Sequence, residues 1–394
     1  MMSGVKYYVF LALLFFGIAR ADEGQSRLLL RTWAYSYQFD EDDVYTNDWR
    51  DSGVGALGRL MYEKLGANTS ASVALQYATI SDVNTGAVGN TVDIERSNRL
   101  SWRHTGDSYS AADIDRLYLG YSQNRFSASI GRMAINLSRT FYFSPNDFFA
   151  PFAAYAFYRE HKAGVDAVRM SWEPVELSRI SLLSVEGYTP DLQSDTGWSV
   201  GPDSDRRSYL ASVSTTVANA ELGLMGGHVR DARIFGASLQ TGLGDLFDLR
   251  AEGHVAEPDV DRDLDSAQWA AGLGYRPNSD VELRVEYYRN GDGVTEPANY
   301  DLLLADSPYL GRHYAAAGIV YQWSAVTIFN AVVLGNLDDD SVLASINFVR
   351  SLSDESDMDI SLSIPFGDRT DTPTIESEYG LYPASFTIEW RSYF

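Results

Sequence analysis

An alternation of apolar and polar residues, recurring along almost the whole chain, is the feature that most constrains the fold. In residues 281–288, VELRVEYY, apolar side chains alternate with Glu and Arg. The same period of two recurs in residues 247–255, 267–276 and 384–394. Successive side chains of a β-strand point to opposite faces, so each segment has one apolar and one polar face. The pattern predicts an all-β chain built from many strands.

Segment length and spacing favour a transmembrane barrel over a soluble β-sandwich. Most segments have about 9–12 residues, which suits a tilted strand that crosses a bilayer, whereas strands of globular proteins usually have about five or six. Short turns alternate with long connections, as in outer-membrane barrels with short periplasmic turns and longer external loops. Aromatic residues gather near segment ends, where interfacial girdles lie. The long connections are residues 40–53, 82–111, 137–161, 189–206, 290–311 and 365–383.

The number of strands follows from parity. Both termini of such a barrel are periplasmic, so the strand number is even. Nineteen segments alternate, and the weakest is 94–104, in which Glu, Arg and Asn interrupt the apolar face. Assigning this segment to a long external loop gives eighteen strands. We therefore predict an antiparallel up-and-down barrel of eighteen strands, with sixteen as the next count.

The first 21 residues have the pattern of a secretory signal peptide. Lys6 precedes a mostly apolar run over residues 7–18, which is followed by Ala19-Arg20-Ala21, a small-x-small cleavage pattern. The run is too short for a transmembrane helix, which takes about twenty residues. We expect cleavage after Ala21, and we expect residues 22–394 to form a single outer-membrane barrel.

Composition excludes several classes of function. The chain has no Cys, so it has no disulfide scaffold, no Cys nucleophile and no attachment site for c-type haem. Its net charge of −23 argues against nucleic acid, since phosphate binding needs clustered Lys and Arg. Neither a G-x-S-x-G nor an H-E-x-x-H motif occurs, and no Gly-rich phosphate loop opens a helix. We expect no enzymatic activity, no metal site and no cofactor.

The C-terminal segment carries a resemblance to a known family. Residues 384–394, ASFTIEWRSYF, alternate and end in Phe394, which resembles the final-strand signature of Gram-negative outer-membrane barrels. With the signal peptide and the hairpins, the whole mature chain resembles an outer-membrane porin of the specific-porin type. The resemblance implies that Phe394 is a membrane-insertion signal and that the cell outer membrane is the location. It also implies the barrel assembly machinery, lipid and lipopolysaccharide as partners, and a homotrimer as a common arrangement.

A second, narrower resemblance concerns residues 131–169. This region is similar to porin-like proteins of environmental proteobacteria and to barrels that partner multihaem cytochromes in electron conduits. It makes a cytochrome an alternative partner of the barrel.

The polar faces of the predicted strands define the pore lining, because a Lys or Arg facing lipid costs about 2–4 kcal/mol at the bilayer midplane. Rings of charge inside a pore set ion selectivity. Two interpretations stay open: side chains that touch the permeating solute, or neutralising pairs that stabilise a hydrated interior. The predicted pore-lining residues are Arg116, Arg169, Arg250, Glu252, Arg284, Glu286, Glu389 and Arg391.

Residues 137–161 form an unusually aromatic connection for an external loop. Such an apolar segment must be covered, so we predict that it folds into the barrel as the constriction. The alternatives are a cap on the rim and a surface buried against another protomer. Its predicted polar contacts are Arg139, Asp147, Arg159, Glu160 and His161.

Acidic clusters lie in three other connections, residues 40–51, 257–265 and 338–340. Their carboxylates suit divalent cations that bridge to lipopolysaccharide, or they form a solvated rim that enriches cations near the mouth.

Together these features predict a porin-like channel for passive diffusion of small hydrophilic solutes. The alternative is a structural barrel that sheathes a multihaem cytochrome or a secreted polymer.

Overall fold

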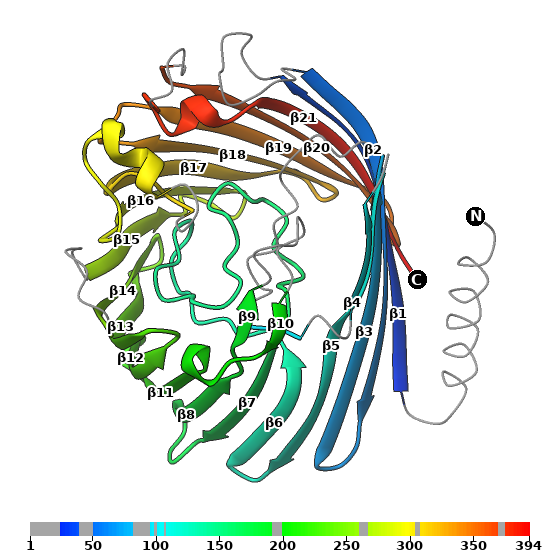
Figure 1. Ribbon diagram of the computed structural model, residues 1–394, viewed down its shortest axis with the longest axis vertical. Coiled ribbons are helices and arrows are strands. Elements are labelled where there is room, and N and C mark those ends of the chain that lie inside the picture. The colour runs from blue at the N-terminus through cyan, green and yellow to red at the C-terminus, as the bar shows by residue number, and fades with distance from the viewer. Residues whose placement is uncertain are drawn as a thin grey trace.

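A computed structural model describes residues 24–38, 50–81, 95–97, 101–105, 108–190, 199–259, 267–303, 308–368 and 375–394. The predicted signal peptide, its cleavage site and most residues of the first two acidic clusters lie outside these ranges. Within them the chain folds as a single closed, antiparallel β-barrel, seen from one end in Figure 1.

Eighteen strands form the barrel wall, and β1 pairs with β21 to close it. The wall strands are β1 (Gly24–Gln38), β2 (Arg50–Leu65), β3 (Thr69–Ile80), β5 (Tyr109–Gln123), β6 (Phe126–Met133), β7 (Val165–Trp172), β8 (Ser178–Val185), β11 (Ser208–Val217), β12 (Ala220–Val229), β13 (Ala232–Leu243), β14 (Phe247–Pro258), β15 (Ala267–Tyr275), β16 (Val281–Arg289), β17 (His313–Ser324), β18 (Thr327–Asn336), β19 (Val342–Ser353), β20 (Ser356–Phe366) and β21 (Ala384–Tyr393). The predicted count of eighteen is therefore confirmed.

The segment that weakens the sequence pattern is not a wall strand. Among its described residues lies one short strand, β4 (Ser101–Thr105), which pairs with Tyr109–Asp113 at the start of β5. The remaining part of β5, from Leu117 to its end at Gln123, pairs with β6 instead. Residues 94–104 thus belong to a long connection, as predicted.

Short and long connections alternate around the barrel. At the end where β1 begins and β21 ends, the turns between strands have two to five residues. At the other end lie the long connections, together with two short ones at residues 230–231 and 337–341. These long connections contain a small hairpin, β9 (Tyr188–Pro190) and β10 (Ser199–Pro202), and the short helices η3 (Ser204–Arg206), η4 (Pro297–Leu302) and η5 (Tyr379–Leu381). None of the helices in the described ranges is long and apolar enough to cross a membrane.

The outer face of the wall is apolar, and the inner face carries charged side chains together with apolar residues that are covered inside the barrel. On β16, Leu283 and Val285 point outward and are 40% and 54% exposed, whereas Glu286 points inward and is buried. β14 has the same alternation, with Val255 outside and Glu252 inside. An exposed apolar surface on a barrel is the surface that a bilayer covers.

The connection between β6 and β7, residues 134–164, lies inside the barrel and not beyond its rim (Figure 1). It packs against the inner wall through two clusters of buried residues. One cluster is Phe141, Tyr142, Phe143, Ala154, Ala270, Tyr288, Tyr314, Ala316, Val332, Leu334, Leu343 and Tyr379. The other is Met133, Ile135, Phe149, Val165, Ala167, Leu183, Val185, Leu210, Val229 and Ile234.

Candidate functional site

The infolded connection, residues 134–164, and the wall that it contacts form the candidate site. This segment contains the predicted constriction, residues 137–161, and its aromatic side chains are covered by the barrel's own inner face. What the segment contacts, and what it leaves accessible, determines which predicted residues can meet a solute.

Glu252 on β14 anchors one turn of the infolded connection. Its carboxylate accepts hydrogen bonds from the backbone N–H groups of Arg139, Thr140 (3.3 Å) and Asn146 (3.2 Å). The Asn146 side chain adds a contact with His254, whose Nδ1 lies 3.3 Å from Asn146 Oδ1. A buried carboxylate is tolerated when several donors satisfy it. Glu252 therefore holds the connection in place.

Glu286 on β16 anchors the adjacent turn in the same way. The backbone N–H groups of Phe141 (2.7 Å), Tyr142 (3.1 Å) and Phe143 (2.7 Å) all donate to its carboxylate. Three successive N–H groups that converge on one anion form a nest, a backbone arrangement that favours negative charge. The predicted pore-lining residue Glu286 is thus also an anchor.

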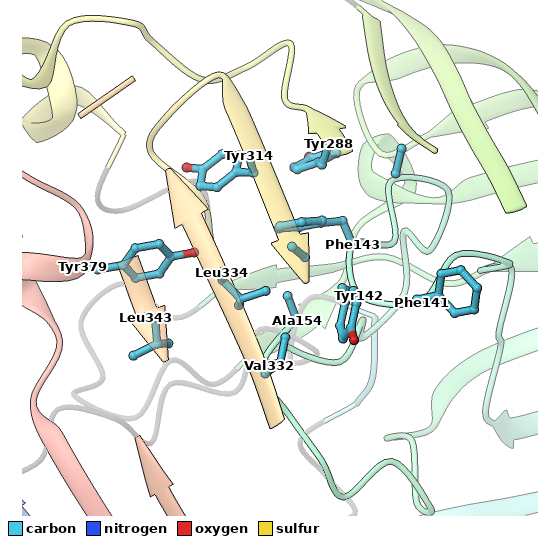
Figure 2. Packing of buried hydrophobic residues seen from close by; sticks show 12 residues of the cluster. Phe141, Tyr142, Phe143, Ala154, Tyr288, Tyr314, Val332, Leu334, Leu343 and Tyr379 are labelled. Carbon is cyan, nitrogen blue, oxygen red and sulfur yellow. The ribbon is translucent and has the colours of Figure 1, made fainter. Parts of the chain in front are cut away.

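An aromatic cage holds the tip of the connection. The Phe143 ring lies 4.9 Å from Tyr288, 5.5 Å from Tyr309 and 5.7 Å from Tyr314, measured between ring centroids. Figure 2 shows Phe143 below Tyr288, with Tyr314 to the left of both. Ring pairs at these distances add stabilisation beyond the area that they bury. The tip is therefore fixed by packing as well as by Glu286.

Arg159 organises the returning half of the connection. Its guanidinium donates to the backbone carbonyls of Ala156 (2.9 Å), Phe141 (2.8 Å) and Ala154 (2.9 Å). The fork of donors on Arg suits several acceptors at once. Arg159 thus joins the two halves of the connection to each other.

The other four predicted polar residues of the connection differ in exposure. Asp147 is buried in an ion pair with Lys162, and burial raises the pKa of Asp147. Arg139 is 39% exposed and pairs with Glu221 of β12 at 2.5 Å. Glu160 is exposed, and His161 lies 4.0 Å from it with a pKa lowered by burial.

Tyr158 contacts the opposite wall, where the first and last strands meet. Its ring lies 4.1 Å from the guanidinium carbon of Arg31 and 4.7 Å from that of Arg391. Glu389 accepts from both arginines at 2.5 Å, and Arg391 also contacts Asp359. The predicted lining residues Glu389 and Arg391 are therefore members of a mutually neutralising network.

Arg250 and Arg284 lie on the two sides of Phe141. Their guanidinium carbons are 4.3 Å and 5.2 Å from the centre of its ring. Each Nε donates to the carboxylate two residues earlier on the same strand, Asp248 at 2.8 Å and Glu282 at 2.7 Å. Both side chains keep about a quarter of their surface accessible, at 26% and 28%. This pair combines charge with partial access beside the infolded connection.

Two further predicted residues lie elsewhere on the wall. Arg116 on β5 donates to Asp115 at 2.9 Å and contacts the carbonyl of Lys162, while Asp115 also binds Arg59 of β2. Arg169 on β7 is exposed, and its side chain forms no hydrogen bond or ion pair within the described ranges.

A second inward segment, residues 95–97, was not foreseen from the sequence. Glu95 binds Arg230 at 2.6 Å, and the N–H of Ser97 donates to Asp166 at 2.8 Å. Arg96 contacts Asp113 of β5. The interruption of the apolar pattern in 94–104 was the available signal, because charges that break a strand face still need partners.

The structure therefore brings together Arg139, Arg250, Glu252, Arg284, Glu286 and Arg159 around residues 139–143. Arg116, Arg169, Glu389 and Arg391 lie on other parts of the wall. Sequence analysis missed Phe141 as a contact of the arginines. The acid-x-Arg spacing of Asp248 with Arg250 and of Glu282 with Arg284 was a usable signal, since residues two apart share a strand face.

Asp338 and Asp339 of the third acidic cluster bind residues close to them in the structure. Asp338 accepts from the His313 backbone at 2.7 Å and lies 2.9 Å from its ring, and Asp339 accepts from Asn336 at 3.1 Å. In the described ranges no group of three or more His, Asp or Glu is arranged to hold a metal ion. Phe394 pairs with Leu28 through two backbone hydrogen bonds of 2.8 Å, and its role in insertion stays a prediction.

No family model and no curated protein matches the chain by sequence. Solved structures, however, match it over almost its full length. OccAB1 of Acinetobacter baumannii aligns with a TM-score of 0.59 at 10% identity, covering 95% of this chain and 98% of that one. A BenF-like porin from Pseudomonas fluorescens Pf-5 aligns with a TM-score of 0.62 at 9% identity, covering 95% and 99%.

OccK8 (OprE) of Pseudomonas aeruginosa aligns with a TM-score of 0.57 at 11% identity, covering 95% of this chain and 98% of that one. At such identities the likeness establishes the fold. The chain shares the barrel fold of these outer-membrane porin structures, and its own barrel has eighteen wall strands with residues 134–164 folded into the interior.

Proposed function

We propose that this chain is an outer-membrane channel through which small hydrophilic solutes diffuse passively, with residues 134–164 as the constriction. Barrels of 16–18 strands are wide enough to leave an aqueous channel. The apolar outer face, and the short turns at the end where β1 begins and β21 ends, support a bilayer location with that end in the periplasm. No catalytic step is part of the proposal.

The observation that carries the proposal is the accessibility of charged groups inside the barrel. Arg139, Arg250 and Arg284 are 39%, 26% and 28% exposed, although they lie on or beside the inner face. A partly exposed guanidinium requires water beside it. The same groups give a permeating anion its first contact at the constriction, while the acidic outer connections repel it.

The anchoring of the connection favours a channel over a sheath around a large partner. Glu252 and Glu286 together accept six backbone N–H groups from it, so a cytochrome or polymer could enter only by breaking these bonds. A charge-assisted hydrogen bond contributes about 1.5–3 kcal/mol. A copurifying red multihaem protein would support the sheath instead.

We propose further that a signal peptide exports the chain and is removed after Ala21, that residues 22–394 form the mature barrel, and that Phe394 is the insertion signal. We expect the barrel to lie among lipid and lipopolysaccharide and to assemble as a homotrimer. Mass spectrometry of the protein from outer membranes tests the cleavage site, and deletion of Phe394 tests insertion.

The experiment that tests the channel is planar-bilayer recording with the refolded mature chain under a KCl gradient. We expect stable ohmic single-channel steps, and a reversal potential that shifts toward cation preference when Arg250 and Arg284 are both changed to Gln. Heat-modifiable gel mobility establishes that each preparation is folded. Folded protein without conductance in repeated preparations would overturn passive transport.

A further inference from the structure

Phe141 lies in a niche that the barrel wall leaves open for it. The inner face of β15 carries Gly272 and Gly274, with no side chain at either position. A Cβ atom at Gly272 would lie 2.9 Å from Cδ2 of Phe141, and one at Gly274 would lie 3.1 Å from its Cζ. The ring therefore occupies the space that two side chains would otherwise fill.

The strands on both sides of this niche each place an arginine at its edge. Arg250 of β14 is paired in register with Gly272, and Arg284 of β16 is paired with Gly274. Directly paired residues of an antiparallel sheet point to the same face. The ring thus lies on a floor of glycine between two guanidinium groups, with their carbons 4.3 Å and 5.2 Å from its centre.

Hydrogen bonds on both sides fix the backbone of Phe141. Its N–H donates to Glu286 at 2.7 Å, and its carbonyl accepts from Arg159 at 2.8 Å. Both partners are themselves fixed, one on β16 and the other by carbonyls of the same connection. The point from which the ring extends is consequently fixed relative to β15.

Each arginine is also tied to an acid on its own strand. Asp248 accepts from Nε of Arg250 at 2.8 Å and lies 2.6 Å from its Nη2, and Glu282 accepts from Nε of Arg284 at 2.7 Å. The Nη1 of Arg250 donates to the carbonyl of Arg139 at 3.4 Å. Without the ring, the two guanidinium groups would lose the contact that separates them on the inner face. With the ring in place, each guanidinium group lies against it, and the positive charge is attracted to the π-electrons of the ring.

We propose that Phe141 is a positioning residue that determines ion selectivity, because it holds the guanidinium groups of Arg250 and Arg284 apart and accessible to a passing anion. This inference rests on the proposed channel function. Gly272 and Gly274 of β15 contribute to the same arrangement, because their missing side chains determine how closely the ring approaches the barrel wall.

The test compares Phe141→Ala with Gly274→Ala by reversal potential in a KCl gradient. Gly274→Ala displaces the ring without changing either arginine. We expect both to lower the anion-to-cation permeability ratio about two- to fivefold, the factor that corresponds to an exposed cation–π contact. Phe235→Ala is the matched control, because this ring lies on the outer face of β13, is 62% exposed and should leave the ratio unchanged.

A double-mutant cycle separates positioning from simple pore shape. In the Arg250→Gln/Arg284→Gln background, Phe141→Ala should leave the permeability ratio unchanged, because the groups that it positions are gone. An equal shift in both backgrounds, or no shift in the wild-type background, would overturn the inference while leaving the channel intact. A wild-type protein that is folded but does not conduct would instead overturn the channel itself.

Discussion

Glu286 of β16 and Phe143 of the infolded connection are joined by a 2.7 Å hydrogen bond across 143 residues of sequence, from the backbone N–H of Phe143 to Oε1. Phe141 and Tyr142 donate to the same carboxylate. This one side chain therefore fixes the position of three residues of the constriction on the barrel wall.

We expect Glu286→Gln to loosen the constriction. The amide has N–H donors where one carboxylate oxygen accepted, and the backbone N–H groups of residues 141–143 need acceptors at this position. A buried donor without an acceptor costs about 1–3 kcal/mol. The free energy of unfolding in urea should fall by about 3 kcal/mol, the low end for breaking a buried charged contact. Amide hydrogen exchange at residues 139–146 should rise.

Glu221→Gln is the matched control for this change. Glu221 also contacts the connection, through Arg139, but both side chains are more than a third exposed. An exposed ion pair contributes about 0–1 kcal/mol. Equal losses in the two variants would contradict the anchoring role of Glu286.

Arg159→Lys should release the returning half of the connection, because a single ammonium cannot replace a fork that binds carbonyls of Ala156, Phe141 and Ala154. We expect a local loss of about 1–3 kcal/mol, measured as faster hydrogen exchange over residues 153–159. Arg139→Lys, which changes an exposed pair in the same connection, should leave this exchange as in the wild type. Faster exchange in both variants would refute the special role of Arg159.

The barrel could be predicted from the sequence because the period of two leaves little freedom. In residues 281–288 the alternation puts Arg284 and Glu286 on one face. Because a charged side chain in lipid costs free energy, this face must point into the barrel. The same reasoning places Arg250 and Glu252 of β14 inside. Strand number followed from parity once residues 94–104 were assigned to a connection.

The destination and contacts of the connection could only partly be predicted. Its aromatic composition is compatible with the interior, the rim or another protomer, and the choice depends on acceptors more than 100 residues away. Glu252 and Glu286 bind backbone N–H groups, which every non-proline residue carries, so no side-chain pattern marks these partners. For the same reason the sequence could not distinguish a loop anchor from a solute contact.

Tyr158→Leu should free the far end of the connection from the seam between β1 and β21. The ring contacts Arg31 at 4.1 Å and Arg391 at 4.7 Å, and a cation–π contact contributes about 0.5–2 kcal/mol. Because the chain has no Cys, a single Ala156→Cys gives one thiol whose labelling rate reports local opening. We expect faster labelling in the Leu variant.

Tyr158→Phe keeps the aromatic face and removes only the 2.9 Å hydrogen bond to the exposed Glu160. Its labelling rate should match that of the wild type. If Phe and Leu accelerate labelling equally, the hydroxyl and not the ring holds this end of the connection.

The last prediction concerns Glu378, a buried carboxylate in the connection between β20 and β21. One oxygen, Oε2, accepts from Tyr314, from Asn336 at 2.9 Å and from the backbone N–H groups of Leu310 (3.2 Å) and Gly311 (3.3 Å). The other, Oε1, has no partner in the described ranges. Burial raises the pKa of Glu378 to about 7, despite these hydrogen bonds.

No cation is among the largest contributions to this pKa, and Asp339 raises it further. The tyrosines that interact electrostatically with Glu378 are Tyr288, Tyr300, Tyr309, Tyr314, Tyr379 and Tyr382. Glu378 is therefore a neutral acid in the folded protein at pH 6, where it is ionised in the unfolded chain.

The direction of the pH effect follows from the protons bound. Between the ordinary value of 4.5 and about 7, the folded state holds a proton that the unfolded state has released, so stability falls as pH rises through this window. The loss between pH 5 and pH 8 is at most about 3 kcal/mol. Below pH 4.5 both states are protonated and this contribution no longer changes.

Hydrogen exchange of residues 308–312 and 375–381 at pH 5.5 and pH 8, corrected for intrinsic rates, measures the effect where it arises. We expect lower protection at pH 8 in the wild type and in Glu376→Gln, a change at an exposed position two residues away. Glu378→Gln keeps an acceptor without a titrating proton, so its protection should not depend on pH in this window. A pH dependence that persists in Glu378→Gln would assign the effect to another group.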